Sequence, residues 1–266
     1  MLGAIIGDIV GSRFEWHNYR AKDFEFFSNK CFVTDDSIMS LAVCEAICEA
    51  GDDYMHLGEI TVKAMQRIGR PYPHCGYGGA FLHWMYSDEP APYGSFGNGA
   101  AMRVSGCGFA AKFLDEAKIL SREVTAITHN HPEGLKGAEA TAVAIFLARQ
   151  GKTQAEIKAH ICEHYYNIDF TLDDIRATYE FNETCQNTVQ QALEAFFEAQ
   201  SFEDAIRNAI SIGGDSDTIA AITGGIAEAY FGIPKDLRIK ALSFLDERLS
   251  PILERFEAKF PPKIVN

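Results

Sequence analysis

The chain has little positive charge for its acidity. It carries 24 Lys and Arg residues against 37 Asp and Glu residues, which gives a formal net charge of −13. Proteins that bind a nucleic-acid backbone rely on Lys and Arg to neutralise phosphates. The balance therefore argues against duplex DNA or RNA as the primary partner. An excess of acidic residues is more consistent with a cluster of carboxylates that binds cations, although most acidic side chains only solvate the surface.

Paired cysteines and membrane-length apolar runs are also missing. The seven cysteines are an odd number and include no C-x-x-C pair, which is typical of a reducing compartment. The apolar start, MLGAIIGDIVGS, has no basic segment, is interrupted by Asp8 and is too short to cross a bilayer. We therefore expect a cytoplasmic protein with no membrane partner.

A linker is the third absence. The 266 residues contain no Pro/Gly/Ser-rich stretch and no abrupt change of composition. With 47% hydrophobic and 23% charged residues, the chain has enough apolar side chains for one large core. We predict a single domain over residues 1–266.

Helical periodicity is the pattern that is present. Apolar residues recur at spacings of three and four, and breakers such as Gly69-Arg70-Pro71 separate the periodic segments. No stretch shows a convincing alternation of β-branched residues, so the sequence predicts an all-α fold. The periodic segments are Ile38–Ala50, Leu57–Ile68, Gly134–Ala148, Val189–Phe197, Ala205–Ile212 and Ile219–Tyr230.

Two of these helices are preceded by acidic segments. Thr34-Asp35-Asp36-Ser37 comes before one, and Gly213-Gly214-Asp215-Ser216-Asp217-Thr218 before the other. Helix capping explains a Thr, Ser or single Asp at such a position. It does not readily explain two carboxylates at both starts, because each charge resists burial unless something positive offsets it.

Divalent cations are one such offset. Adjacent side chains on a helix diverge by about 100°, so Asp35 and Asp36 suit bracketing two cations better than gripping one. Asp and Thr oxygens are hard ligands that select Mg²⁺, Ca²⁺ or Mn²⁺. Neither segment contains a His or Cys that would favour zinc.

A further acidic pair lies near the start of the chain, in Gly7-Asp8-Ile9-Val10-Gly11-Ser12-Arg13-Phe14-Glu15. Asp8 falls inside an apolar helix, either as a structural carboxylate whose hydrogen bonds are satisfied or as a group that supports a site. Glu15, taken alone, is typical of a surface acid. The regular spacing of Gly3, Gly7 and Gly11 indicates close helix packing.

A Gly-rich turn leads into another helix at Ser95-Phe96-Gly97-Asn98-Gly99-Ala100-Ala101-Met102-Arg103. Free N–H groups at such a helix start are suited to phosphate, and the Phe96 ring offers a surface for a base. Taken alone, this signal is weak because Gly-rich loops before helices are common. His129 and His131, in Thr128-His129-Asn130-His131-Pro132, are typical of residues at a helix end or on the surface.

Together these segments resemble the ADP-ribosylglycohydrolase family, over nearly the whole chain from Gly3 to about Gly232. The combination of GDIVGSRFE, TDDS, GNGAAMR, THNHPEG and GGDSDT carries the resemblance. Many members have TDDT where this chain has Ser37, which keeps the hydroxyl. The resemblance implies an all-helical domain with a central cleft for two Mg²⁺ or Mn²⁺ ions.

Carried over by motif position, the resemblance implies a role for each site residue. Glu15 is implied to lie near the metal and to move as substrate enters, and His129 to lie near the diphosphate of ADP-ribose. The implied metal ligands are Thr34, Asp35, Asp36, Asp215, Asp217, Thr218 and Glu15. The residues implied to hold the diphosphate and adenosine side are Ser95, Phe96, Gly97, Asn98 and Gly99.

The implied reaction is hydrolysis of the bond between C1 of the distal ribose of ADP-ribose and an acceptor. Either Asp36 or Glu15 would take the proton from water. The substrate would be an ADP-ribosylated protein or a small ADP-ribosyl compound, with nucleic acid entering only as a modified substrate. Two alternatives stay open: a non-catalytic, ADP-ribose-binding or crystallin-like member of the family, and another dimetal phosphoester hydrolase.

Overall fold

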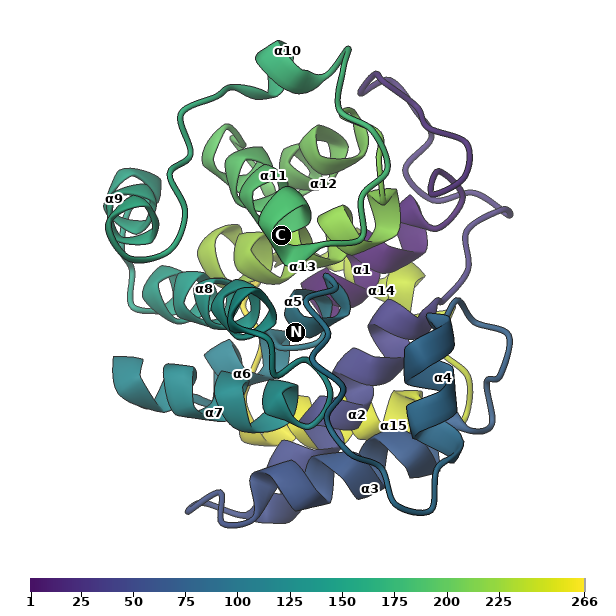
Figure 1. Ribbon diagram of the computed structural model, residues 1–266. Helices are drawn as coiled ribbons and strands as arrows, with labels where there is room; N and C mark the ends of the chain where they lie inside the picture. The colour runs from purple at the N-terminus through teal and green to yellow at the C-terminus, as the bar shows by residue number, and fades with distance from the viewer. Residues whose placement is uncertain (266) are drawn as a thin grey trace.

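Helix α1 (Leu2–Gly11) lies against α13 (Ser216–Phe231) at the centre of the computed structural model, which describes residues 1–265 (Figure 1). Every residue of α1 is buried, as is every residue of α13 up to Ala229. A helix that is covered on all sides needs side chains that are small or apolar, and the Ala-, Ile- and Gly-rich sequences of both helices meet this need except at the buried acids Asp8, Asp217 and Glu228.

The other helices surround this pair. Helices α8, α11 and α12 contact α13, whereas α2 contacts α1 and is itself covered by α3 and α15. The remaining bounds are α2 (Asp35–Ala50), α3 (Leu57–Gly69), α4 (Gly79–Tyr86), α5 (Gly99–Met102), α6 (Ser105–Ala110), α7 (Leu114–Ala126), α8 (Pro132–Arg149), α9 (Gln154–His164), α10 (Leu172–Ile175), α11 (Cys185–Phe197), α12 (Phe202–Ile210), α14 (Lys235–Leu242) and α15 (Ser250–Lys259).

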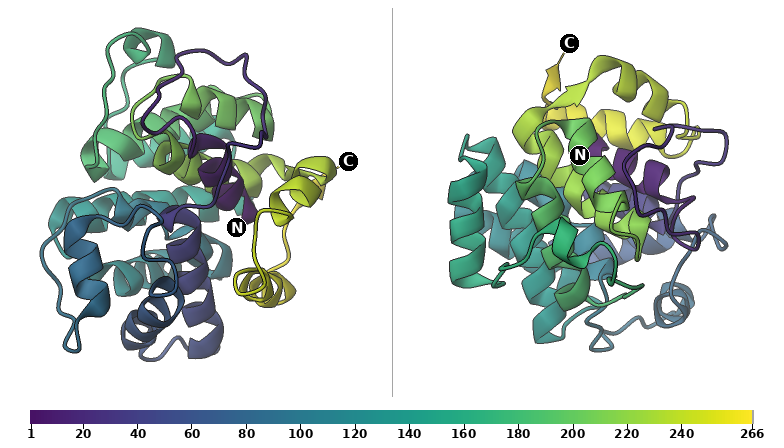
Figure 2. Two further views of the ribbon diagram at one scale, coloured as in Figure 1. Left: turned by 90° about the vertical axis from the view of Figure 1, so that its right-hand side faces the viewer. Right: turned by 90° about the horizontal axis from the view of Figure 1, so that it is seen from above.

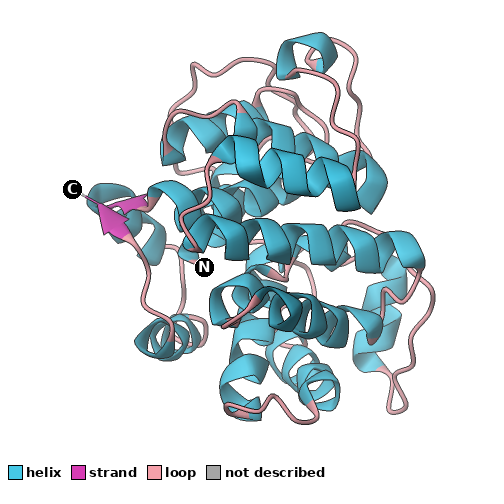
Figure 3. Ribbon diagram, turned by 90° about the vertical axis from the view of Figure 1, so that its left-hand side faces the viewer, coloured by secondary structure: helices cyan, strands magenta, loops and turns pink. Residues whose placement is uncertain are grey.

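The all-α prediction is confirmed, with one small addition. Strands β1 (Ile233–Pro234) and β2 (Ile264–Val265) pair in parallel, with Ile233 opposite Ile264 (Figure 3). Two residues per strand are too few to leave an alternating pattern in the sequence. Within residues 1–265, no helix combines the length and apolar character that crossing a membrane requires.

Two of the predicted helices begin three residues earlier in the structure than in the apolar pattern. The segments predicted from Ile38 and Ile219 start at Asp35 and Ser216. Apolar periodicity misses these first turns because their residues are polar. Both acidic segments therefore belong partly to the helices they precede, which fixes their side chains on rigid backbone.

The glycines of α1 allow its close approach to α13, as the spacing indicated. A Cβ added at Gly7 would lie 1.9 Å from the carbonyl oxygen of Ala220, and one at Gly3 would lie 2.3 Å from that of Gly224. At Gly11 the obstacle is the Cα of Asp217, at 2.5 Å. The end of α1 is thus held against the start of α13, where one acidic segment lies.

Replacing Gly7 by Ala should therefore destabilise the fold. The added methyl group meets backbone, which cannot rotate away, so we expect a loss of about 3 kcal/mol or more in the free energy of unfolding. Gly79→Ala is the matched control, because its Cβ meets nothing within 4 Å at the first residue of α4. Denaturant unfolding of both variants measures the difference, and equal stability would contradict the close packing.

Candidate active site

The start of α2 is held in place by Asp8. This carboxylate is fully buried and accepts hydrogen bonds from the Thr34 N–H at 3.1 Å, the Thr34 hydroxyl at 2.6 Å, and the N–H and hydroxyl of Ser37. Burial nevertheless raises the pKa of Asp8 to about 6. Asp8 is thus a satisfied structural carboxylate, and its partners lie on both sides of Asp35 and Asp36.

Capping accounts for Thr34 but not for the two aspartates. The Thr34 hydroxyl accepts the Asp36 N–H at 3.3 Å, as an N-cap does. Asp35 and Asp36 occupy the first turn of α2 and line a cavity of about 260 Å³. Their side chains are therefore available for another purpose.

The start of α13 follows a sharp turn. Gly213 and Gly214 have φ angles of +72° and +78°, in the left-handed region that favours glycine. The side chain of Asn18 holds this turn, since its Oδ1 accepts the Gly214 N–H at 2.6 Å. Asp215 then occupies the N-cap position without making a capping bond, and its Oδ2 accepts instead from the Asn98 amide at 2.7 Å.

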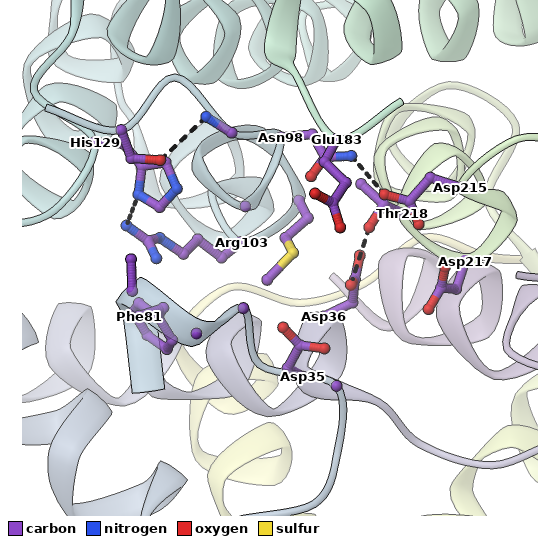
Figure 4. Close-up of a pocket in the computed structure, with 18 of the residues that line it drawn as sticks. Asp35, Asp36, Phe81, Asn98, Arg103, His129, Glu183, Asp215, Asp217 and Thr218 are labelled. Carbon is purple, nitrogen blue, oxygen red and sulfur yellow. Dashed lines mark hydrogen bonds between the residues drawn. The ribbon is translucent and has the colours of Figure 1, made fainter. Parts of the chain in front are cut away.

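The two acidic segments meet across the cavity (Figure 4). The Thr218 hydroxyl donates to Asp36 Oδ2 at 3.1 Å, which links residues 182 positions apart in the sequence. Glu15, Asp215 and Asp217 each place a carboxylate oxygen within 4.8 Å of the other two. The structure therefore brings the three predicted acidic stretches together in one place.

These carboxylates lack positive partners. Among residues 1–265, no Lys or Arg forms an ion pair with Asp35, Asp36, Asp215 or Asp217, and Asp36 Oδ1 and Asp217 Oδ1 are buried without a hydrogen bond. Buried carboxylates that remain unpaired are costly unless a cation offsets them. The donor set fits hard divalent cations, which prefer several oxygen ligands.

The pKa values of these carboxylates reflect their burial and their closeness to one another. Burial, followed by repulsion from Asp217, raises the pKa of Asp35 and of Asp36 well above the usual range. Burial also raises the pKa of Asp217 well above its usual range and that of Asp215 to about 6. For Glu15, burial and then the Asp217 charge raise the pKa to about 7. Each raised pKa means that the ionised carboxylate is destabilised by burial and by its acidic neighbours when no cation is bound.

The opposite wall of the cavity comes from the Gly-rich turn and from His129. Ser95, Gly97, Asn98, Gly99 and His129 all line the cavity. The N–H groups of the turn are less free than the sequence suggested, because that of Gly97 donates to Ser95 Oγ and that of Asn98 to the Glu183 carbonyl. Among the N–H groups of Gly97 to Ala100, only that of Gly99 has no partner within residues 1–265.

Phe96 lies outside the cavity lining. Its side chain is 42% exposed, and its ring centre is 5.1 Å from that of His131. The Phe96 carbonyl accepts the N–H of Cys185, so the residue is fixed at the rim. His129, by contrast, is only 5% exposed and faces the cavity rather than the outer surface.

Two loops that contribute to the cavity lining, the one after α1 and the one around α10, lie side by side in Figures 1 and 2. Arg20 joins them by donating to the carbonyls of Arg176, Tyr179 and Ile212. Trp16 stacks on Phe181 with ring centres 5.0 Å apart. Glu15 enters the cavity from the first loop, and Phe181 and Glu183 from the second.

Several lining residues had no role in the sequence predictions. Arg103 is the last residue of the Gly-rich motif, so its position was a usable signal. Phe81 and Tyr93 were not singled out, and Phe181 and Glu183 lie in a loop without any motif. All five line the cavity.

Comparison with known proteins agrees with the geometry. The family model described as ADP-ribosylglycohydrolase matches residues 1–262. The chain is 26% identical to the ADP-ribosylhydrolase ARH3 of Homo sapiens, over 88% of this chain and 84% of that protein. It is 27% identical to the ADP-ribosyl-[dinitrogen reductase] glycohydrolase of Rhodospirillum rubrum, over 84% of this chain and 76% of that protein.

A solved structure shares the fold. The chain of an ADP-ribosylglycohydrolase-related protein complex superposes with a TM-score of 0.71 at 22% identity, covering 97% of this chain and 95% of that one. At this identity the likeness concerns the arrangement of the helices alone.

Proposed function

Because the chain belongs to the ADP-ribosylglycohydrolase family, we propose that it hydrolyses an ADP-ribosyl linkage with the help of two divalent cations. The bond would be that between C1 of the distal ribose of ADP-ribose and an acceptor, and the cations would be Mg²⁺ or Mn²⁺. The observation that carries the proposal is the meeting of the two acidic helix starts. The Thr218–Asp36 hydrogen bond joins them, and they contain buried carboxylate oxygens that have no hydrogen-bond partner in the described part of the chain.

The residues that would hold the cations are those already described around the cavity. Both helix starts and the loop after α1 contribute oxygen atoms, and bound cations would stabilise negative charge and lower the pKa of water. The proposed ligands that line the cavity are Asp35, Asp36, Asp215, Asp217, Thr218 and Glu15. Thr34, which the family resemblance also implied, does not line it, because its hydroxyl donates to Asp8 and accepts the Asp36 N–H.

Of the two candidates for accepting the proton of water, Glu15 is better placed. Its side chain is only partly buried and enters the cavity from a loop. Asp36 is 3% exposed, sits in the first turn of α2, and already accepts the Thr218 hydroxyl through Oδ2. A general base must reach the proton it removes, which favours the more accessible carboxylate.

The rest of the cavity would bind the ADP-ribose. Ser95, Gly97, Gly99 and His129 line the cavity, and the Ser95 hydroxyl, the Gly99 N–H and the His129 ring offer hydrogen-bond donors suited to a diphosphate. His129 lies away from the labelled carboxylates in Figure 4. Asn98 spans the two regions, because its backbone belongs to the Gly-rich turn and its amide holds Asp215. Phe96, at the rim, is available for a base that extends out of the cavity.

The proposal is tested by incubating the protein with arginine-, serine- and nucleic-acid-linked ADP-ribose and with small ADP-ribosyl compounds. Each substrate is tried with Mg²⁺, with Mn²⁺ and with a chelator, and ADP-ribose and AMP are measured. A phosphomonoester substrate is assayed in parallel for inorganic phosphate. We expect release of ADP-ribose only with a cation. Binding of ADP-ribose without turnover would identify a non-catalytic member, and release of AMP or phosphate alone would identify a phosphoester hydrolase.

Asn98 offers a separate test of the cation site. Asn98→Ala removes the donor that orients Asp215, so we expect the cation concentration for half-maximal activity to rise by about 10–100-fold, as for other groups that support metal ligands. Asn167→Ala, at an exposed position far from the cavity lining, should leave the cation requirement unchanged. An unaltered requirement in Asn98→Ala would contradict the proposed role of Asp215.

A further inference from the structure

Arg103 is a buried cation at the cavity wall. It is 1% exposed, lines the cavity, and makes no ion pair with any carboxylate among residues 1–265. Its Nε has no hydrogen-bond partner in that part of the chain, and its guanidinium carbon lies 5.5 Å from the centre of the Phe81 ring. Burial lowers the pKa of Arg103 to about 10, which still leaves it charged at neutral pH.

The hydrogen bonds of Arg103 lead to His129 (Figure 4). One terminal nitrogen, Nη2, lies 2.5 Å from the Thr128 hydroxyl oxygen and 3.3 Å from His129 Nδ1. The Thr128 hydroxyl oxygen is in turn 2.7 Å from the same Nδ1. His129 Nδ1 therefore faces a guanidinium and a hydroxyl.

The chemistry of these partners determines where the histidine proton lies. A guanidinium has only donors, so a nitrogen that it contacts must accept. The Thr128 hydroxyl accepts from Arg103, and its own proton has a closer acceptor in Nδ1, at 2.7 Å, than in the Thr125 carbonyl oxygen, at 3.5 Å. A neutral imidazole that accepts at Nδ1 carries its proton at Nε2.

His129 is also held in the neutral form. Burial, and then the charge of Arg103, place the pKa of His129 well below its usual range. The adjacent guanidinium would repel an imidazolium, so the ring does not need to protonate to act as a donor. Its Nε2–H is a donor already.

Nε2 points toward the Gly-rich turn. A Cβ placed on Gly99 would lie 3.3 Å from this atom, and one on Gly97 would lie 3.6 Å from it. A side chain at Gly99 would crowd the ring, and glycine leaves the space beside Nε2 open. The partnerless N–H of Gly99 lies on the same wall.

We propose that Arg103 is a positioning residue that fixes His129 as the Nε2–H tautomer, so that the ring presents a permanent donor to a phosphate oxygen of the ligand. The inference rests on the proposed function for the identity of the ligand, but the tautomer itself is a property of the ligand-free protein. Arg103 thus acts through His129, and Thr128 completes the arrangement.

The tautomer is measured directly by two-bond ¹H–¹⁵N NMR of the ring nitrogens in ¹⁵N-histidine-labelled protein. The eight histidines are separated by comparison with His129→Gln, which removes one set of signals. We expect His129 to show an unprotonated Nδ1 and a protonated Nε2, without change between mildly acidic and neutral pH. An Nδ1–H tautomer, or an imidazolium at neutral pH, would overturn the proposal.

The effect on ligand binding is tested with Arg103→Lys, which keeps the charge but has a shorter side chain and lacks the Nη2 that contacts both Thr128 and His129. We expect mixed tautomers and about a tenfold weaker affinity for ADP-ribose, the size of one lost hydrogen bond. The kcat should change little, because the phosphates are remote from the bond that breaks. An unchanged tautomer and affinity in Arg103→Lys would refute the positioning role.

Arg149→Lys is the matched control. This arginine also lies near an aromatic ring, but it is exposed and donates to the carbonyls of Gly108 and Ala111, which do not line the cavity. An equal loss of affinity in both variants would assign the effect to general destabilisation and overturn the inference. If the wild-type protein binds no ADP-ribose, the proposed function and the phosphate contact both fail, whereas the tautomer measurement still decides the role of Arg103.

Discussion

Asp217→Asn is expected to lower the rate of ADP-ribose release by about 10³-fold or more, beyond the 10–100-fold typical of groups that only support metal ligands. Asn keeps the shape of the side chain and removes its charge. Within residues 1–265, Asp217 Oδ1 is buried without a hydrogen-bond partner, and its carboxylate is one of the three whose oxygens lie within 4.8 Å of one another. Activity is measured at saturating Mn²⁺ and over a range of cation concentrations.

The same variant should be more stable than the wild-type protein when cations are removed. Burial and the neighbouring acids raise the pKa of Asp217 well above its usual range, so its charge opposes folding in the chelated protein. We therefore expect a higher melting temperature together with lower activity. Loss of activity with a lower melting temperature would indicate simple misfolding.

The exposed Asp88 provides a control for this variant. It makes no side-chain hydrogen bond or ion pair within residues 1–265, so Asp88→Asn should change neither stability nor activity. Full activity of Asp217→Asn would show that this carboxylate is not a ligand of the proposed cation site.

In the presence of a chelator, the stability of the wild-type protein should fall as the pH rises from about 4.5 to 7. The folded-state pKa values of Asp8 and Asp215 are raised to about 6 and that of Glu15 to about 7, all above their unfolded values. The folded protein therefore binds more protons than the unfolded chain in this range. Each extra proton lowers the free energy of unfolding by about 1.4 kcal/mol per pH unit.

Saturating Mn²⁺ should reverse this dependence. A cation that binds only the folded state at about 100 times its Kd adds about 2.7 kcal/mol, or roughly 5–10 °C in melting temperature. The gain should be larger at pH 7.5 than at pH 5, because protons compete with the cation for the carboxylates. Thermal unfolding at several pH values, with Mn²⁺ or with a chelator, measures both effects.

Two outcomes would contradict this account. If the melting temperature rose with pH in the presence of the chelator, ionisation of the acidic cluster would not destabilise the folded protein. An equal Mn²⁺ shift in the wild-type protein and in Asp217→Asn would place the bound cation elsewhere.

The sequence predicted the site best at positions where a residue type destabilises the fold unless it has a specific role. Paired aspartates before two helices are hard to explain as caps, and the structure shows that Thr34 alone makes the capping bond at α2. The four-residue glycine spacing likewise favoured close helix packing, which the contacts of Gly7 confirm. These patterns are local, so a single sequence reveals them.

The remaining parts of the site depend on contacts between distant segments. Glu183 and Phe181 reach the cavity from a loop whose residues have no distinctive spacing. His129 was typical of a surface or helix-end residue on its own pattern, and only the family resemblance directed attention to it. Arg103 stood within a recognised motif, but its contact with His129 appears only when the helices are assembled.

The contact between Asp36 and Thr218, 182 residues apart, also has a consequence for biosynthesis. Until α13 has left the ribosome, the nascent chain contains Asp35 and Asp36 but not the opposing acids, and the glycine face of α1 has nothing to pack against. The cation centre therefore cannot assemble during most of translation. A ribosome-bound chain stalled before residue 215 should neither retain Mn²⁺ nor resist protease at α1, whereas one released after α13 should do both.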